Sequence, residues 1–274
     1  MILVRVALGV AILGLGFGVV ERVWPSIVGH RWWRRRGVRT DLAYFLYSPT
    51  AGKVLSGIVV FAAVMSLATV FQQDLTVDQL RGLAQRDTVV GRQAPIVQVV
   101  EMLLVGDLIG YWTHRAFHTF TIMWRAHAVH HSSTELDWLS SARVHPINEL
   151  VNNLATATPL ILMGFSPAAV GAYIPFVTLY AIMLHANVSW TFGPLRALLA
   201  SPVFHRWHHS LDATDRNFAG LFPFYDRLFG TYYMPAGELP ARFGLVRARV
   251  PESFLGQMAY PLRRRNGRPG AAPA

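Results

Sequence analysis

The chain has 274 residues, of which 53% are hydrophobic and only 15% are charged, against about 25% charged in an average soluble domain. With a mean hydropathy of +0.33, this composition excludes an ordinary soluble domain and predicts an integral membrane protein. The absence of cysteine excludes disulfides, thiolate metal sites and cysteine nucleophiles, so any metal must be held by nitrogen and oxygen.

The formal net charge is +10, which is compatible with nucleic acid, anionic lipid or an acidic protein as partner. The arginines lie beside apolar spans rather than along a soluble surface interleaved with aromatic residues. We therefore expect no nucleic-acid partner, and we assign the basic residues to anionic lipid headgroups and acidic proteins.

The first predicted element is an apolar run over residues 2–20, about the length that a bilayer requires, with Arg5 near its start where the side chain can reach the interface. A cleaved signal peptide is the competing interpretation. No small-x-small cleavage site follows the run, so we expect an uncleaved anchor. Residues 30–40, HRWWRRRGVRT, combine five arginines with two tryptophans. This composition predicts a cytoplasmic loop, with His30 as an interfacial side chain.

Two further spans are predicted at residues 54–71 and 95–113. The charges of residues 74–93 between them cancel, which suits the non-cytoplasmic side, so the third span returns the chain to the cytoplasm. Residues 147–165 and 168–187 are typical of a helical hairpin. Because its first arm is polar at the start and apolar afterwards, we expect the hairpin to dip into the bilayer and come back.

Histidine dominates the chemistry that the sequence offers, since ten of the eleven histidines lie between positions 114 and 209. One pair has the spacing i, i+4 and two triplets share the spacing i, i+3, i+4, so on a helix each set projects from roughly one face. Under the predicted topology all ten approach the cytoplasmic face. A lone histidine is more often structural, but eight in three spaced groups predict metal ligation. The groups are His114 and His118; His127, His130 and His131; and His205, His208 and His209.

Two single histidines extend the candidate set. His185 lies near the cytoplasmic end of the returning hairpin arm, on the same side as the three groups, which favours a ligand role. His145 precedes a proline, as at a helix start, so it is either a ligand or a residue that caps or orients.

The number of imidazoles predicts a dinuclear centre. Zinc usually takes four ligands, whereas the eight to ten histidines in this region are enough for two metals of higher coordination number. Imidazole suits iron, copper, nickel and zinc alike, so ligand type does not name the metal.

An acid is expected to orient one of these ligands. Asp107 shares a helical stripe with His114 and His118 and lies within an apolar span, where an acid is costly and marks a functional position. Metal-bound histidines usually donate their second N–H to a carboxylate or carbonyl, which is the role we predict for Asp107. Sequence motifs of zinc proteases, serine hydrolases, P-loop proteins and dinucleotide-binding folds are missing. Redox chemistry would therefore draw its electrons from another protein.

These elements predict an all-α polytopic membrane protein with about three spanning helices, a helical hairpin and a cytoplasmic cap that holds two metals through histidine. We divide the chain into membrane spans with a basic loop over residues 1–100, a catalytic region over 101–235 and a basic tail over 236–274. The end of the tail, PLRRRNGRPGAAPA, is expected to be disordered.

Residues 104–233 resemble the fatty acid hydroxylase and sterol desaturase superfamily of membrane non-haem di-iron enzymes. The matching stretches, in order, are DLIGYWTHRAFH, WRAHAVHHSS, RVHP, HANVSW, SPVFHRWHHS and DRLFGTYY. Each is weak alone, but their order and spacing together are highly specific. The first 100 residues match only in being membrane spans.

The resemblance implies a multi-pass enzyme that binds two iron ions, uses O2 as co-substrate, and hydroxylates or desaturates a lipid such as a fatty acyl, sterol-like or other isoprenoid lipid. It implies an external ferredoxin-, rubredoxin- or cytochrome b5-like electron-transfer protein with its reductase, and a place in the cell inner membrane with the metal site on the cytoplasmic side. The ligands it implies are His114, His118, His127, His130, His131, His185, His205, His208 and His209.

Five further positions bear on the family pattern. His145 matches a family position, and Asn217 and Asp226 match positions that look structural or supporting. Where many relatives have an acid, this chain has Asn148, with Glu149 one place later, so that acid receives no role.

Two alternatives stay open at the level of sequence. The ligand pattern does not separate a hydroxylase from a C-5 sterol-type desaturase. A histidine-rich metal transporter belongs to another class, and it calls for ligands spread through the spans at bilayer depth. The histidines here lie at span ends and beyond them.

Overall fold

The computed structural model describes residues 2–70, 88–246 and 249–263. Within these ranges the chain is helical, and its only strand-like pairings are two isolated bridges, Pro25 with Val188 and Ser210 with Phe243. The prediction of an all-α fold is confirmed. Most of the charge-balanced segment 74–93 and the end of the basic tail lie outside the described residues.

Four helical stretches are long and apolar enough to cross a membrane, against the predicted three spans and a hairpin. Three of them overlap the three predicted spans, and the fourth is the returning arm of the hairpin. Hydrophobic side chains along these stretches face outward, as a lipid environment requires. The stretches are Val4–Val23, Val38–Ala63, Pro95–Thr119 and Ala168–His185.

The second stretch begins well before the predicted start at residue 54. Helix α2 (Val38–Tyr47) continues through a π-helical turn, Ser48–Gly52, into α3 (Lys53–Val70). Pro49 lies at the start of that turn, where the wider helix tolerates a missing backbone N–H. The predicted start therefore matches the start of α3, and the π turn extends the helical stretch toward the N-terminus beyond the apolar run.

The predicted hairpin is formed by α7 (Pro146–Met163) and α8 (Pro167–His185). Gly164 ends α7 with a φ of 76°, a conformation that favours glycine, and the Ser166 side chain accepts a hydrogen bond from the Ala169 backbone N–H to start α8. The hairpin therefore delivers the end of α8 back to the level at which α7 begins.

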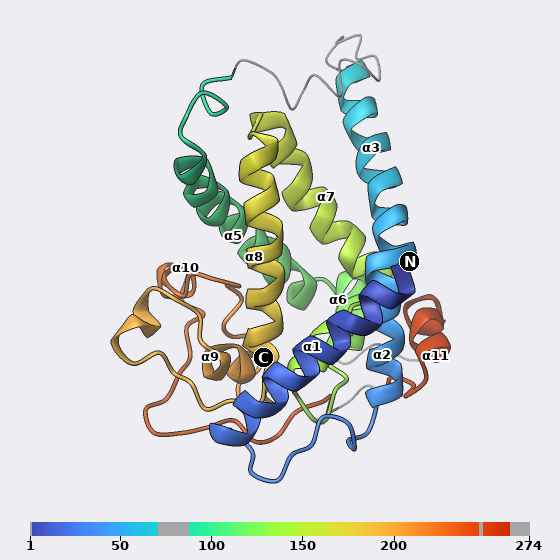
Figure 1. The fold of residues 1–274 in the computed structure, drawn as a ribbon, viewed down its shortest axis with the longest axis vertical. Coiled ribbons are helices and arrows are strands. Elements are labelled where there is room, and N and C mark those ends of the chain that lie inside the picture. Colours follow the sequence, from blue (N-terminus) through green and yellow to red (C-terminus); the bar gives the residue numbers. More distant parts are fainter. Residues whose placement is uncertain (1, 71–87, 247–248, 264–274) are drawn as a thin grey trace.

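Figure 1 shows α3, α5, α7 and α8 side by side, with the short helices gathered at one end of this bundle. Helix α5 (Pro95–Thr119) packs on α7 and α8, and its end meets α6 (Thr121–His130). Helix α9 (Pro202–His208) packs against the end of α8. The histidines thus lie where the bundle ends.

Helix α1 (Ile2–Val23) runs obliquely across this end of the molecule (Figure 1). Its inner face packs on the buried Trp138, which also contacts side chains of α2 and α8. The remaining short elements are the 3₁₀ turns Trp138–Ala142 (η2), Gly193–Ala197 (η3) and Tyr260–Leu262 (η4), and the helices Phe224–Leu228 (α10) and Phe254–Ala259 (α11).

Candidate metal centre

The first two groups of histidines are brought face to face by a reversal of the chain between α5 and α6. Phe120 leaves the helical conformation, with φ −94° and ψ 119°, so α6 folds back beside the end of α5. His114 and His118, four residues apart on the last turns of α5, project toward α6. The Nε2 atoms of His114 and His127 are 3.1 Å apart.

The two histidine triplets are shared between two clusters. In each triplet the first and last histidines, four residues apart, face one cluster, and the middle histidine faces the other. Helix α6 gives its outer pair to a five-histidine cluster, and α9 gives its outer pair to a four-histidine cluster, so the two clusters interlock. The five-histidine cluster consists of His114, His118, His127, His131 and His208, and the four-histidine cluster of His130, His185, His205 and His209.

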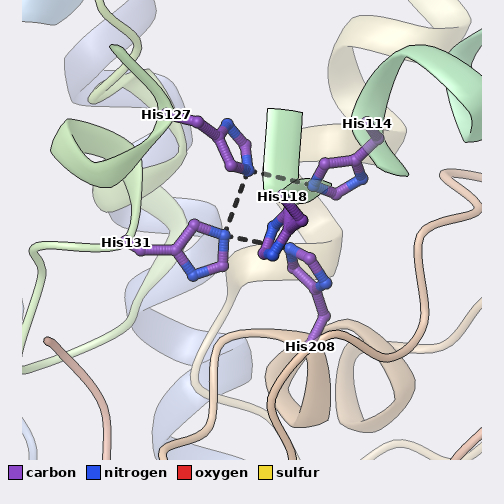
Figure 2. Close-up of side chains that lie close together, drawn as sticks. All are labelled: His114, His118, His127, His131 and His208. Carbon is purple, nitrogen blue, oxygen red and sulfur yellow. Dashed lines mark hydrogen bonds between the residues drawn. The ribbon is translucent and has the colours of Figure 1, made fainter. Parts of the chain in front are cut away.

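In the five-histidine cluster, rings from α5, α6 and α9 point toward one another (Figure 2). Within each cluster one nitrogen atom from every member lies within 4.8 Å of the others. The Nε2 atom of His131 is 3.1 Å from that of His127 and 3.0 Å from that of His208. The predicted pair and both triplets therefore meet in one buried region.

His185 joins the four-histidine cluster from the end of α8. Its Nε2 atom lies 3.2 Å from those of His130 and His205. The Nε2 atom of His209 is 3.2 Å from that of His205. All four members are buried, so the end of the hairpin closes the second cluster as the topology predicted.

Hydrogen bonds at Nδ1 fix the ring orientation and the tautomer of these histidines. The Nδ1–H groups of His130 and His185 donate to the carbonyl oxygens of Arg143 and Ala181, at 3.0 Å and 2.8 Å. A carbonyl only accepts, so Nδ1 carries the proton, and in a neutral ring Nε2 then carries a bare lone pair. Two such lone pairs face each other 3.2 Å apart, which is repulsive unless a cation lies between them.

A proton is a poor candidate for that cation. Burial, together with neighbouring histidines, lowers the pKa of the six cluster histidines on α6 and α9 well below the ordinary histidine value. The six are His127, His130, His131, His205, His208 and His209. In addition, the buried Nε2 atom of His118 has no hydrogen-bond partner among the described residues.

The spacing fits a metal ion instead. Two imidazole nitrogens bound about 2.1 Å from one ion, at an angle near 90–100°, lie about 3.0–3.2 Å apart. The Nε2 contacts within the clusters span 3.0–3.2 Å. The donor set and its geometry therefore suit a metal centre in each cluster.

The loop after α9 orients three histidines of the five-histidine cluster, and sequence reasoning did not find it. The Nδ1–H group of His118 donates to the side chain of Asp215, that of His208 to the backbone carbonyl of Arg216, and that of His114 to the carbonyl of Phe218. These distances are 3.0 Å, 2.7 Å and 2.9 Å. Backbone carbonyls carry no sequence signal, so only Asp215, close after the last triplet, could have been suspected.

The three predicted supporting residues hold this loop rather than the histidines. Asp107 accepts hydrogen bonds from three successive backbone N–H groups, of residues 220–222, so the prediction that it contacts a histidine directly was wrong. Asp226 accepts from the backbone of Phe218. Asn217, at a φ of 59°, bonds the backbone on either side of the loop. All three fix the loop whose carbonyl groups receive the histidine N–H groups.

Asn148 holds a ligand in place although it stands where an acid was expected. Its Oδ1 atom accepts from His127 Nδ1 at 2.7 Å. An amide oxygen performs the acceptor role of a carboxylate without adding a buried charge. Glu149 makes no such contact.

His145 lies outside both clusters, and its ring nitrogens are both used by the protein. Nδ1 accepts from the backbone N–H of Ile147 at 3.1 Å, which caps α7, and Nε2–H donates to the carbonyl of Met258 at 3.1 Å. This tautomer is the reverse of the one in the clusters. Of the two predicted roles, the geometry is that of a cap.

His30 is not the interfacial side chain that the loop composition suggested. Its side chain is 6% exposed, and its Nε2 atom lies 3.0 Å from the carboxylate of Asp137. His30 is therefore held inside the protein by the buried carboxylate of Asp137.

The described residues form helices, four of them long and apolar enough to cross a membrane, together with two histidine clusters that could hold metal. These features define a class, that of multi-pass membrane proteins with a candidate metal centre at one end of the helix bundle. The family model of fatty acid hydroxylase matches residues 99–231. Residues 99–231 therefore match a fatty acid hydroxylase domain, and the resemblance seen in the histidine motifs is confirmed.

Similar proteins include an ornithine lipid hydroxylase from Rhizobium tropici, 33% identical over 61% of this chain and 51% of its own length. An alkylglycerol monooxygenase from Homo sapiens is 34% identical over 44% of this chain and 27% of its own. A very-long-chain aldehyde decarbonylase from Oryza sativa is 32% identical over 50% of this chain and 23% of its own length. The chain thus spans about half the length of the first relative and about a quarter of the others. No solved structure matches it.

Proposed function

We propose that this protein is an O2-dependent lipid hydroxylase that holds one iron ion in each histidine cluster. The observation that carries the proposal is the set of Nε2 lone pairs that converge in two adjacent buried clusters. Imidazole donors accept iron as well as copper, nickel or zinc, and we choose iron because the histidine motifs resemble those of membrane non-haem di-iron enzymes. Clusters of five and four histidines leave coordination positions free on a six-coordinate ion. When bound, two iron ions would supply O2 activation and the oxidising power to attack an unactivated C–H bond.

The protein's own part is binding, orientation and the exclusion of water. Nine histidines bind, and the carbonyl and carboxylate acceptors behind them fix the ring orientations before metal arrives. Burial of the clusters keeps bulk water from a reactive centre.

A membrane lipid is the proposed substrate. The relatives are named for ornithine lipid and alkylglycerol, both lipids. Apolar side chains exposed along α5 and α8 give a lipid a route to the end of these helices, where the clusters lie. Whether the lipid is a fatty acyl, sterol-like or other isoprenoid chain is set by residues that the shared motifs do not include.

The matched family and these relatives support neither a sterol desaturase nor a metal transporter. Hydroxylation therefore stands as the proposed reaction. The division at residues 100 and 235 remains a prediction.

We further propose a place in the cell inner membrane with the clusters on the cytoplasmic side, where an external electron carrier reaches them. Four exposed arginines lie in the basic stretch of residues 30–40, which is paired with the segment that orients His130, and they suit an acidic ferredoxin-, rubredoxin- or cytochrome b5-like donor. They are Arg31, Arg34, Arg36 and Arg39.

Metal analysis and isotope labelling test the proposal together. Protein purified from membranes should contain about two iron ions per chain, one for each cluster, and membranes that contain it should transfer one ¹⁸O atom from ¹⁸O2 into a lipid. His130→Ala should abolish labelling, and membranes without the protein are the blank. A single zinc ion that His130→Ala leaves in place would overturn the proposal.

A further inference from the structure

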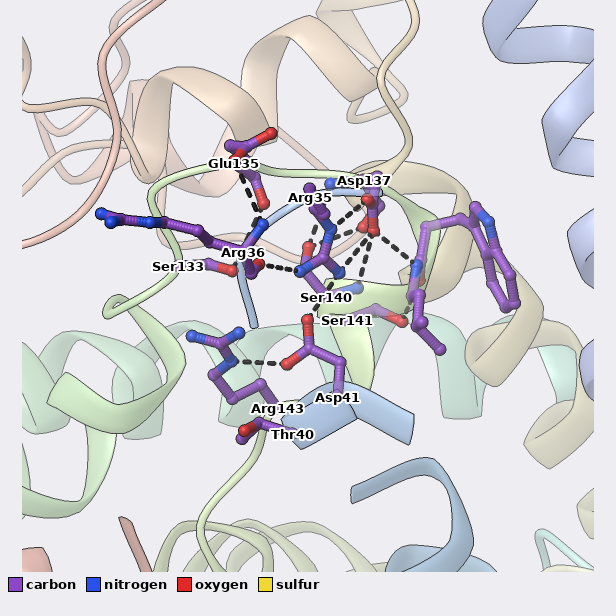
Figure 3. A network of polar contacts seen from close by, with 12 residues as sticks. Arg35, Arg36, Thr40, Asp41, Ser133, Glu135, Asp137, Ser140, Ser141 and Arg143 are labelled. Carbon is purple, nitrogen blue, oxygen red and sulfur yellow. Dashed lines mark hydrogen bonds and ion pairs between the residues drawn. The ribbon is translucent and has the colours of Figure 1, made fainter. Parts of the chain in front are cut away.

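Two arginines and two aspartates form a buried ion network (Figure 3). Arg35, Asp41, Asp137 and Arg143 are 5%, 0%, 0% and 5% exposed. Arg35 Nη2 donates to Asp41 at 2.5 Å and to Asp137 at 2.9 Å, and Arg35 Nε also donates to Asp137. Arg143 Nε donates to Asp41 at 2.5 Å. The charges of the four residues sum to zero.

Asp41 is the centre of this network because its two oxygens hold two different arginines. One oxygen accepts from Arg35 and the other from Arg143. Buried charges are tolerated only when paired, so removing one partner leaves another uncompensated. The network therefore locks the arginine-rich loop to the segment 132–143, far away in the sequence.

Arg143 carries the network to the metal centre. Its guanidinium belongs to the network, while its carbonyl oxygen accepts the Nδ1–H of His130 at 3.0 Å. Asp137 fixes the other end of the same segment by accepting from the backbone N–H groups of Leu139 and Ser140, at 3.0 Å and 3.1 Å. The position of the carbonyl group that orients His130 thus depends on charges supplied by residues 35 and 41.

A second contact from the N-terminal part reaches the chain just after His185. Glu21, on α1, accepts from the backbone N–H groups of Trp138 and Asn187, at 3.2 Å and 2.9 Å. The Asn187 side chain in turn pairs with the backbone of Ile27, at 3.0 Å and 2.9 Å. The end of α8 that carries His185 is therefore tied to the same N-terminal segment.

The five-histidine cluster is supported differently. Partners of three of its members come from residues 215–218, within the fatty acid hydroxylase domain. Residues 21–41 lie outside the matched residues, and their contacts lead to the carbonyl group that orients His130 and, through Glu21, to the chain beside His185. Arg143 also donates to the side chain of Ser132, next to His131 of the five-histidine cluster, at 3.2 Å, and this contact is to the chain rather than to a histidine ring. The hydrogen bonds that orient the rings of the two clusters thus come from different segments.

We propose that residues 21–41 are a positioning element for the four-histidine cluster, with Asp41 as its central residue. The inference rests on the proposed function, because it assumes that each cluster binds an ion. Substitution of Asp41 should lower the affinity of the four-histidine cluster for its ion by about 10–100-fold, as the loss of a residue that supports a ligand does in other metal sites. The other ion should keep its affinity.

The test counts metal in a set of variants of the full chain in detergent. Asp41→Asn removes the charge with little change of shape. Asp212→Asn is the matched control, because it breaks an exposed ion pair with Arg242. His205→Ala and His208→Ala each disable one cluster. Iron per chain after dialysis against a weak chelator is the readout, with far-UV circular dichroism as the check on folding.

Asp41→Asn should retain about one ion and Asp212→Asn about two. Asp41→Asn combined with His205→Ala should also retain about one, because both changes act on the same cluster, whereas its combination with His208→Ala should retain none. If Asp41→Asn keeps both ions, or if the combination with His205→Ala loses the remaining ion, the inference is overturned.

Glu21→Ala provides a second variant should Asp41→Asn fail to fold. In the same combinations it should follow the same pattern, and loss of both ions or of neither would overturn the inference. Wild-type protein that binds no iron would instead contradict the proposed function, so the two failures are distinguishable.

Discussion

At the scale of the single residue, the protonated nitrogen decides what each histidine can do. His114, His130, His185 and His208 donate through Nδ1 to backbone carbonyls and turn bare Nε2 atoms into the clusters. His145 shows the reverse arrangement, with both nitrogens used by the backbone. A histidine with no free lone pair cannot bind metal without breaking a hydrogen bond.

The first prediction separates a cap from a ligand at His145. His145→Ala should lose the cap of α7 and about 0.5–2 kcal/mol of stability, while His145→Asn should lose less because asparagine also caps helices. Both variants should keep the wild-type metal content. Melting temperature and iron per chain, measured on the same preparations, check the two statements.

His130→Ala is the comparison for this prediction, since it removes a buried member of the four-histidine cluster. It should lose about one ion. A loss of metal in His145→Asn as large as in His130→Ala would show that His145 is a ligand after all.

At the scale of the element, α6 and α9 carry the same histidine spacing, but the outer pair of each triplet belongs to a different cluster. The periodicity of a helix made it predictable that the first and last histidines of each triplet project from one face, and the turn at Gly164 made the hairpin predictable. The exchange of the middle histidines was not predictable, because it depends on how α6 and α9 face each other across nearly eighty positions of sequence. The carbonyl groups of Phe218 and Arg143, which accept from histidine rings, were not predictable either. Every residue has a backbone carbonyl, so the sequence does not mark the one that the fold brings to a histidine.

Helix α1 offers an element-scale prediction through two of its glycines. A Cβ atom at Gly14 would lie 2.8 Å from Trp32 and 3.4 Å from Trp138, whereas one at Gly16 would meet nothing within 4 Å. Gly14→Ala should therefore destabilise the protein by about 1–3 kcal/mol through overpacking. Gly16→Ala, the control on the same helix, should be neutral or gain up to about 1 kcal/mol from helix propensity.

Melting temperatures of the two glycine variants in one detergent give the comparison. Gly14→Ala should melt below the wild type and Gly16→Ala at or above it. Equal melting of the two would mean that α1 does not pack on Trp138 in the membrane protein.

At the scale of the whole molecule, the metal centre joins parts that no single helix holds together. The clusters draw histidines from α5, α6, α8 and the end of α9, and their supports come from the N-terminal segment on one side and the loop after α9 on the other. The apolar bundle needs no metal for its packing, since α3 packs directly on α7, and α5 packs directly on α7 and α8. Stability should therefore be divided between a bundle that is independent of metal and an end that depends on it.

Metal removal tests that division. Each ion that binds only the folded state, present at one hundred times its dissociation constant, adds about 2.7 kcal/mol, so removal of both ions by a chelator should lower the melting temperature by about 10–20 °C. Limited proteolysis of the chelated protein should cut first in residues 132–136 and 210–216, which adjoin the clusters, and later in the turn of the α7–α8 hairpin. The variant His205→Ala/His208→Ala, already without both sites, should not respond to the chelator. Cleavage that starts at the hairpin turn, or a chelator effect that survives in this variant, would show that the centre does not organise this end of the molecule.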